Sequence, residues 1–279
     1  MRSFFILSNQ RKEESYRVAL QLEEEIRRQC GDAKVCIADE KNRDVDFTKD
    51  LLIPEGSECV IVIGGDGTVL SVAKAAMNEQ VPLLGVNLGN LGYLTEVEIA
   101  SIPRAVERLL ADDYIIENRM MLEGEIHGRC ISALNDIVLS RKGDLQVVGY
   151  RIYVNGLLLN DFFADGVILS TPTGSTGYNL SAGGSIVEPS AQLIVLTQVC
   201  PHTLNARSII LSPEDRIEVE ILPPKGEKCV SVGAYFDGGN GVDIAPGERI
   251  CIRRSSHKTK MIKLSDVSFL KVLHQKIGE

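Results

Sequence analysis

The first 117 residues alternate between two hydrophobic periods. Buried strands are predicted by short apolar runs at residues 4–7, 34–38, 59–63 and 81–86. Helical spacing of apolar residues marks segments 14–30, 68–78 and 101–111. In the first of these, Val18, Leu22 and Ile26 are spaced by four. Strands that alternate with helices predict a parallel sheet covered by helices, so we expect a Rossmann-like α/β domain over residues 1–117.

From residue 118 the pattern predicts strands almost alone. These strands are expected at residues 119–126, 130–140, 147–154, 157–163, 166–170, 193–199, 207–211, 216–222, 229–236 and 248–253. Turn residues such as Asn155-Gly156 and Asp237-Gly238-Gly239 separate them. We therefore expect an all-β, sandwich-like domain over residues 118–254, and a helix at 268–276 near the end of the chain.

Composition and charge narrow the classes of function. Apolar residues make up 44% of the 279 residues, as in a folded domain, and the net charge of −8 argues against nucleic acid or an anionic membrane as partner. No apolar run is long enough for a signal peptide or a membrane span. The seven cysteines are odd in number and form no C-x-x-C pair, which predicts reduced thiols in a cytoplasmic protein.

A glycine-rich turn, Gly64-Gly65-Asp66-Gly67-Thr68, joins a predicted strand to a helix. Free N–H groups and the helix dipole favour an anion there, so Gly64, Gly65, Gly67 and Thr68 are candidate phosphate-binding residues. The turn matches neither the Walker loop nor the dinucleotide fingerprint. The Asp66 carboxylate would repel a bound phosphate, so we expect it to have a separate function. The alternative is that Asp66 caps the helix N-terminus.

Two further segments with candidate binding residues lie at the end or the start of a predicted strand. NLGNLGYLTE at 87–96 contains Gly89, Gly92 and Tyr93 at the carboxyl edge of the predicted parallel sheet, where ligands bind in open α/β folds. LNDIVLSR at 134–141 contains Asn135 and Asp136; an adjacent amide and carboxylate can bind a base edge and a diol. The alternatives are a plain surface loop and an Asx turn.

A fourth segment, residues 164–190, is rich in hydroxyl groups and glycine. It reads ADGVILSTPTGSTGYNLSAGGSIVEPS. Its threonine and serine hydroxyls suit binding of a nucleotide through neutral hydrogen bonds.

Together these segments resemble one family, the NAD kinases. The resemblance covers residues 59–254 and also includes PHTLNARSIIL at 201–211. GGDGT by itself is shared with diacylglycerol kinases, sphingosine kinases and phosphofructokinases. Two alternatives are therefore kept: a lipid kinase of the diacylglycerol or sphingosine type, and a non-catalytic dinucleotide sensor.

The resemblance implies transfer of the γ-phosphoryl group of ATP to the 2′-hydroxyl of the adenosine ribose of NAD, which makes NADP. Asp66 would accept the hydroxyl proton, and a divalent ion, Mg²⁺ by expectation, would accompany the phosphoryl donor, which is ATP or, as an alternative, polyphosphate. The implied NAD-binding residues are Asp66, Gly67, Tyr93, Asn135, Asp136, Asp165, Thr173, Thr176, Gly177, Tyr178, Asn179, Leu180 and Ser181. The metal ligands stay open.

The resemblance also implies an architecture. It places the active site in a cleft between an α/β domain and a β domain, and returns the tail of about residues 255–279 to the first domain. It implies a homodimer or homotetramer. Five positions depart from the family's commoner residues: Tyr93, Asp136, Phe163, Gly177 and Gly239. Phe163 stands where a basic residue is common and Gly239 where Gln is common, so the resemblance does not imply a contact to the dinucleotide at these two positions.

Overall fold

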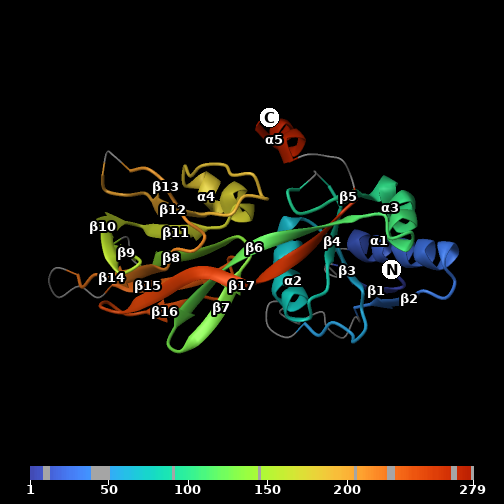
Figure 1. Cartoon of the computed structure of the whole chain (residues 1–279), viewed down its shortest axis with the longest axis horizontal. Helices are drawn as coiled ribbons and strands as arrows, with labels where there is room; N and C mark the ends of the chain where they lie inside the picture. The colour runs from blue at the N-terminus through green and yellow to red at the C-terminus, as the bar shows by residue number, and fades with distance from the viewer. Residues whose placement is uncertain are drawn as a thin grey trace. The chain divides into compact units, whose positions relative to one another are not determined.

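The computed structural model describes residues 1–8, 13–38, 51–89, 92–143, 146–203, 206–224, 230–264 and 269–277. The chain divides into two compact units, one of Met1–Asn118 with Thr259–Glu279 and one of Arg119–Lys258. Both are labelled by element in Figure 1. The long strands β6 (Ile115–Ile126) and β17 (Arg249–Lys263) each contain residues of both units.

The first unit is built on a parallel sheet. Its order is β4-β3-β1-β2, with bounds β1 Ser3–Ser8, β2 Lys34–Ile37, β3 Cys59–Ile63 and β4 Leu83–Asn87. Short β5 (Val97–Glu98) pairs with β4 on one side, and Met261 of β17 pairs with Leu83. Every residue of β3 and β4 is buried, as expected for central strands of a covered parallel sheet. The predicted α/β fold is confirmed.

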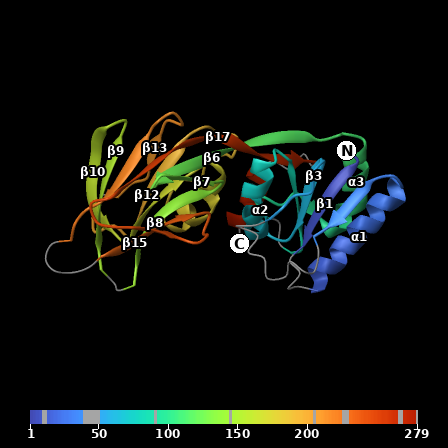
Figure 2. The ribbon, with the colours of Figure 1, turned by 90° about the horizontal axis from the view of Figure 1, so that it is seen from below.

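Helices cover both faces of this sheet. One face packs against α1 (Glu13–Gln29) and α3 (Ile102–Leu110), whose apolar sides join one core cluster with Phe4, Ile6 and Ile61 of the strands. The predicted inward residues Val18, Leu22 and Ile26 are all buried there. Helix α2 (Asp66–Asn78) packs on β3 and β4 outside that cluster, and Figure 2 shows it on the opposite side of the strands from α1. Two short elements complete the unit: the 3-10 turn η2 (Ile99–Ser101) and α5 (Phe269–Ile277).

The second unit holds two antiparallel sheets. The first has the order β13-β12-β11-β8-β15-β16, with bounds β8 Asp136–Lys142, β11 Gly166–Ser170, β12 Ile194–Val199, β13 Ile209–Leu211, β15 Ser231–Phe236 and β16 Val242–Ile244. The second joins β10 (Leu157–Ala164), β9 (Val148–Val154), β14 (Ile217–Ile221) and β17, with β7 (Arg129–Ala133) paired to β6. Side chains from both sheets form one hydrophobic core, so the predicted all-β, sandwich-like unit is confirmed.

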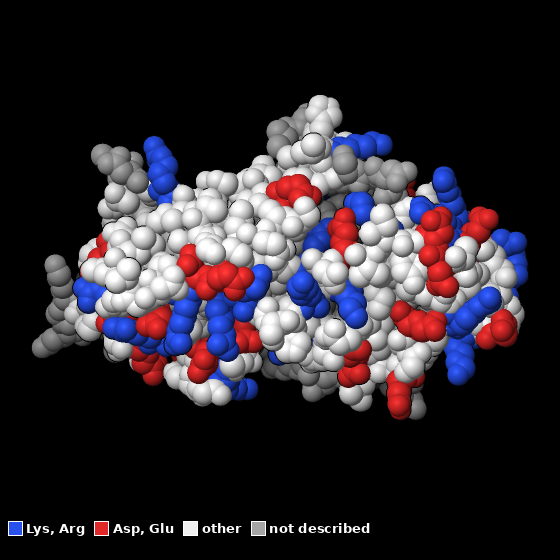
Figure 3. Space-filling model, in the orientation of Figure 1, with Lys and Arg blue, Asp and Glu red and all other residues white. Residues whose placement is uncertain are grey.

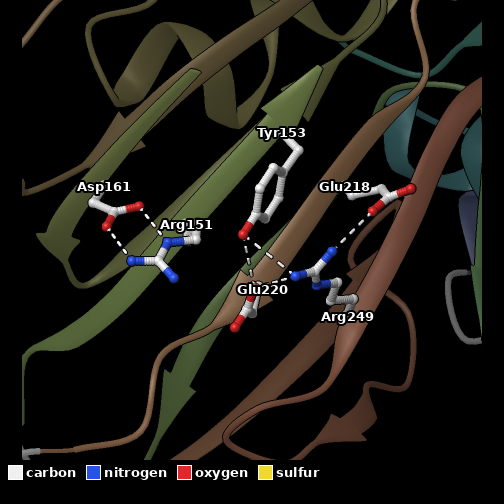
Figure 4. A network of polar contacts seen from close by, with 6 residues as sticks. All are labelled: Arg151, Tyr153, Asp161, Glu218, Glu220 and Arg249. Atoms are coloured by element: carbon white, nitrogen blue, oxygen red, sulfur yellow. Dashed lines mark hydrogen bonds and ion pairs between the residues drawn. The ribbon is translucent and has the colours of Figure 1, made fainter. Parts of the chain in front are cut away.

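The alternation of strand residues explains the outer face of the second sheet. On β14, Ile217, Val219 and Ile221 point into the core, whereas Glu218 and Glu220 point outward. Figure 4 shows these carboxylates on the guanidinium of Arg249, at 3.4 and 2.8 Å, with that cation lying 4.5 Å from the Tyr153 ring. Polar contacts of this kind contribute little stability, but they keep the outer face hydrophilic.

Several predicted boundaries were wrong; among them, β6 begins at Ile115 and not at residue 119. The expected strand 130–140 is two strands, β7 and β8, interrupted at Leu134 and Asn135 because the Asp237 carboxylate binds their N–H groups. Helix α2 begins at Asp66, not at residue 68. The last strand continues to Lys263, ten residues past its expected end at 253 (263 minus 253). Residue 268 of the expected final helix lies outside the described residues, and α5 covers the rest.

Candidate active site

Asp66 is the first residue of α2, directly after the buried strand β3 and its Gly64-Gly65 turn. The residue that caps this helix is Gly65, and it forms no side-chain cap, so the alternative role of Asp66 as helix cap was wrong. The carboxylate instead accepts the Tyr93 N–H on one oxygen at 2.9 Å and the Leu94 N–H on the other at 3.0 Å. Asp66 and the 87–96 segment, both singled out from the sequence, are thus brought together in one unit.

The glycines of this turn are of two kinds. At Gly64 an added Cβ would lie 2.5 Å from the Thr68 hydroxyl oxygen, and the Gly64 N–H already donates to Val86 O at 2.9 Å. At Gly65 and Gly67, which are exposed, an added Cβ would meet no atom within 4 Å. The Thr68 N–H donates to Gly65 O. Open space at the first turn of a helix, where N–H groups lack partners within the helix, can hold an anion.

The Tyr93 side chain connects the 87–96 segment to helix α5, near the end of the chain. Its ring lies 6.0 Å from that of Phe269, centroid to centroid, and 5.0 Å from the Lys276 ammonium, both on α5. Burial, with a smaller contribution from the Asp66 charge, raises the pKa of its phenol. Gly89 lies in the same segment, and residues 90 and 91 lie outside the described residues.

In the second unit, Asn135 and Asp136 stand at the break between β7 and β8. The Asp237 carboxylate accepts the N–H groups of Leu134 and Asn135, both at 2.7 Å, and of Asp136 at 3.1 Å. The Asp237 N–H in turn donates to Asp136 O at 3.1 Å. The sequence marked Asp237 only as a turn residue; nothing within its local pattern indicates that it binds a segment 101 residues away.

Two carboxylates therefore lie close together, Asp136 buried and Asp237 half-buried. Asp136 is only 6% exposed, and burial, followed by the charge of Asp237, raises its pKa from 3.8 to about 7. Burial also raises the pKa of Asp237, against the effect of its three N–H donors. Beside them, the side-chain oxygen of Asn135 is buried and accepts no hydrogen bond from the described part of the chain. Unpaired buried polar atoms are uncommon and mark places where a ligand can bind.

The hydroxyl-rich segment after β11 packs on this break. An added Cβ at Gly174 would lie 2.1 Å from Asn135 O, so only glycine permits the approach. An added Cβ at Gly177 would lie 3.4 Å from the Asn135 amide nitrogen and 3.9 Å from an Asp136 carboxylate oxygen. Thr173, in the 3-10 turn η3 (Thr173–Thr176), accepts a long hydrogen bond of 3.5 Å from buried Arg119. Asn135, Asp136, Thr173 and Gly177 therefore lie in neighbouring segments, and their contacts to NAD stay predictions.

The four residues of α4 (Tyr178–Ser181) divide into exposed and buried positions. Tyr178, Leu180 and Ser181 are exposed. Asn179 is buried; its amide donates to Ser175 O and Ser185 O, both at 3.0 Å, and its oxygen accepts the Thr197 hydroxyl at 2.7 Å. Its polar atoms thus hold the loop itself. Figure 3 shows few charged side chains around α4 on the face in view, and residues 173–185 contain none.

Asp165 and Phe163 lie at the end of β10 and beyond it. The Asp165 carboxylate pairs with the Arg141 guanidinium at 3.0 Å, and Phe163 is 48% exposed. Gly239 closes a turn, its N–H donating to Phe236 O at 3.0 Å. The contact of Asp165 to a dinucleotide stays a prediction, and no such contact is predicted for Phe163 or Gly239.

An open helix N-terminus at the carboxyl edge of a parallel sheet, with a carboxylate held beside it, is suited to a nucleotide-dependent phosphotransferase. Comparisons with known proteins make the class specific. Residues 4–114 match the family model of the ATP-NAD kinase N-terminal domain, and residues 134–264 match that of the ATP-NAD kinase C-terminal domain. The chain belongs to the ATP-NAD kinase family.

Curated relatives agree over the whole length. The chain is 41% identical to the NAD kinase of Agathobacter rectalis, over 100% of this chain and 99% of the relative, and 37% identical to that of Lachnoclostridium phytofermentans, over 100% of both. It shares its fold with yeast NADH kinase complexed with NADH (TM-score 0.88, 22% identity, 100% of this chain and 88% of the other). It also shares it with an Archaeoglobus fulgidus NAD kinase in complex with ATP (TM-score 0.75, 21% identity, 100% and 98%).

Two features are absent from the described residues. None of their helices is long and apolar enough to cross a membrane. Nor do they contain a group of three or more His, Cys, Asp or Glu side chains placed to hold a metal ion.

The raised pKa of Asp136 predicts how the stability of the ligand-free protein depends on pH. The folded state holds this proton more tightly than the unfolded chain does, so ionisation of Asp136 destabilises the fold as pH rises from about 4 to about 7. Asp136→Asn should therefore raise the thermal midpoint more at pH 8 than at pH 5, by about 2–4 °C for each kcal/mol of charge burial removed.

Calorimetry without nucleotide at the two pH values measures this difference. Asp243→Asn, at an exposed carboxylate of the same unit, is the control and should show no such dependence. Equal effects of Asp136→Asn at pH 5 and pH 8 would contradict the raised pKa.

Proposed function

We propose that this protein transfers the γ-phosphoryl group of ATP to the 2′-hydroxyl of the adenosine ribose of NAD, giving NADP and ADP. The observation that carries the proposal is the position of the Asp66 carboxylate, fixed by two backbone N–H groups beside the open first turn of α2. A fixed carboxylate next to a phosphate-binding turn suits a reaction in which a hydroxyl attacks a phosphoryl group.

Asp66 has the capacity for the proton transfer. Each of its oxygens accepts one N–H bond and keeps a second lone pair, which can accept the 2′-hydroxyl proton. As the new bond from the 2′-oxygen to the γ-phosphorus forms, the bond to the β–γ bridging oxygen breaks, ADP leaves, and the proton passes to Asp66. Positioning and neutralisation of charge do the remaining work.

The break between β7 and β8 is the proposed binding site for the adenosine part of NAD. The unpaired oxygen of Asn135 can accept the exocyclic amine of adenine, and the Asp136 carboxylate can accept ribose hydroxyls. Further candidate residues come from the hydroxyl-rich segment that packs on this break: Thr173, Thr176, Gly177 and the exposed side chains of α4. The free amide oxygen supports this role, because a ligand donor there would satisfy a buried acceptor.

Mg²⁺ is proposed to enter with ATP as part of the substrate. It prefers substrate phosphates and water together with one or two carboxylates, which suits an ion that arrives bound to ATP. The ion would neutralise the triphosphate beside Asp66.

A homodimer or homotetramer and a cytoplasmic location complete the proposal. Strand β10 is an edge strand of its sheet and exposes Leu157, Leu158 and Phe163, with Leu158 at 58%. Such an apolar edge is suited to pairing with a second copy.

Six cysteines within the described ranges are free thiols, which fits a reducing compartment.

Formation of NADP from ATP and NAD, followed by a coupled assay, tests the function. Asp66→Asn should lower kcat by about 10²–10⁴ while NAD binding is kept, because the amide lacks the basicity and charge of the carboxylate. The exposed Asp113→Asn, in the same unit, is the matched control and should turn over like the wild type. A dinucleotide sensor would bind NAD in calorimetry and form no NADP, and near-full kcat in Asp66→Asn would remove Asp66 from catalysis.

Gly67→Val tests the phosphate-binding turn separately. The structure has open space where the new side chain would stand, so the variant should fold, yet the side chain would occupy the place proposed for phosphate. We expect turnover to fall by about 10² or more, since small displacements of reacting groups cost that much. Gly31→Val, at an exposed glycine that also has open space, is the control. Wild-type turnover by a folded Gly67→Val protein would show that the turn does not hold the phosphates.

A further inference from the structure

We propose that Thr95 is a positioning residue for the proposed phosphoryl transfer, because its hydroxyl shapes the backbone turn that holds the Asp66 carboxylate. The proposal rests on the proposed role of Asp66 as proton acceptor. Thr95 acts through the segment Gly92–Leu94, which we call the Asp66 clamp.

The Asp66 clamp fixes the orientation of the carboxylate. Its two consecutive N–H groups, from Tyr93 and Leu94, each bind a different oxygen of Asp66, at 2.9 and 3.0 Å. Rotation of the side chain would break both bonds, and N–H groups bind a carboxylate more strongly than a neutral acceptor. The lone pair that remains on each oxygen therefore points in a direction set by the clamp.

Thr95 closes the turn that presents these N–H groups. Its hydroxyl accepts the Gly92 N–H at 3.0 Å, across three residues, and the side chain is only 4% exposed. With the Gly92 N–H bound to Thr95, the next two N–H groups are left to converge on Asp66. An added Cβ at Gly92 would lie 2.0 Å from an Asp66 oxygen and 2.7 Å from the Thr95 hydroxyl oxygen, so the three groups are in close contact.

The clamp is anchored at both sides. The Glu96 N–H donates to Gly85 O of β4 at 2.9 Å, and an added Cβ at Gly85 would lie 2.7 Å from Leu94 O. The Tyr93 ring packs on Phe269 of α5. A sheet strand and a helix thus hold the residues whose N–H groups bind Asp66, and the Thr95 hydroxyl sets the turn between them.

Thr95→Val and Thr95→Ser separate the hydroxyl from the shape of the side chain. Valine is nearly the same size but cannot accept the Gly92 N–H, whereas serine can. We expect Thr95→Val to lower kcat for NADP formation on the order of tenfold, by misplacing the carboxylate, with dissociation constants for NAD and ATP unchanged. Thr95→Ser should restore kcat.

A double-mutant cycle shows whether the effect passes through Asp66. In an Asp66→Asn background, Thr95→Val should lower kcat no further, because the group that it positions is already lost. An equal fall of kcat in both backgrounds, a loss of NAD affinity as large as the loss of kcat, or wild-type kcat in Thr95→Val would each overturn the proposal.

A second variant and a second readout cover the remaining cases. If Thr95→Val does not fold, Gly92→Ala takes its place, since its new methyl group displaces an Asp66 oxygen directly; wild-type kcat there would equally overturn the proposal. If the wild type makes no NADP, the proposed function fails, and amide hydrogen exchange still tests the clamp. The Tyr93 and Leu94 amides should be protected in the wild type and lose protection in Thr95→Val, and unchanged protection would contradict the role of Thr95.

Discussion

Carboxylates that accept consecutive backbone N–H groups are the interaction on which both candidate regions depend. In the second unit, Asp237 binds the N–H groups of Leu134, Asn135 and Asp136 and so ends one strand and starts the next. In the first unit, Asp66 binds those of Tyr93 and Leu94. The two cases have opposite purposes: the Asp237 carboxylate is buried to position the backbone, whereas the backbone of the clamp positions the Asp66 carboxylate.

Holding these groups costs stability in the second unit. The carboxylates of buried Asp136 and half-buried Asp237 have raised pKa values, and Asp237 has a left-handed backbone with a φ of +50°. The Asn135 oxygen adds a buried acceptor without a partner in the described structure. Strained or unpaired groups of this kind persist in folded proteins mainly at binding sites, where a ligand interacts with them. Here a ligand that donates hydrogen bonds to Asn135 and to ionised Asp136 would offset two of these costs, so binding of such a ligand and ionisation of Asp136 would favour each other.

Local sequence patterns predicted most of the helices and strands. Features that depend on hydrogen bonds between distant residues could not be predicted from those patterns. The alternation of periods gave the parallel sheet, its helices and the β-rich unit, because those patterns record burial of neighbouring residues. The run at residues 130–140 predicted one strand, since the break within it depends on Asp237, about 100 residues later. Thr95 carried no signal either, because a threonine after a glycine-rich loop is unremarkable until its hydroxyl is seen to bind Gly92. The candidate residues came from motifs, and their contacts came from the structure.

The glycines also show the difference between what a sequence pattern predicts and what only the structure reveals. A glycine-rich sequence predicts a turn or a close approach but not what approaches it. At Gly64, Gly85, Gly92 and Gly174, an added side chain would meet atoms of the chain itself, so these glycines serve packing and the shape of the site. At Gly65 and Gly67 it would meet nothing, and both are exposed at the first turn of α2. Packing within the chain therefore does not require glycine at these two positions, whereas a phosphate group approaching the N–H groups of that turn would.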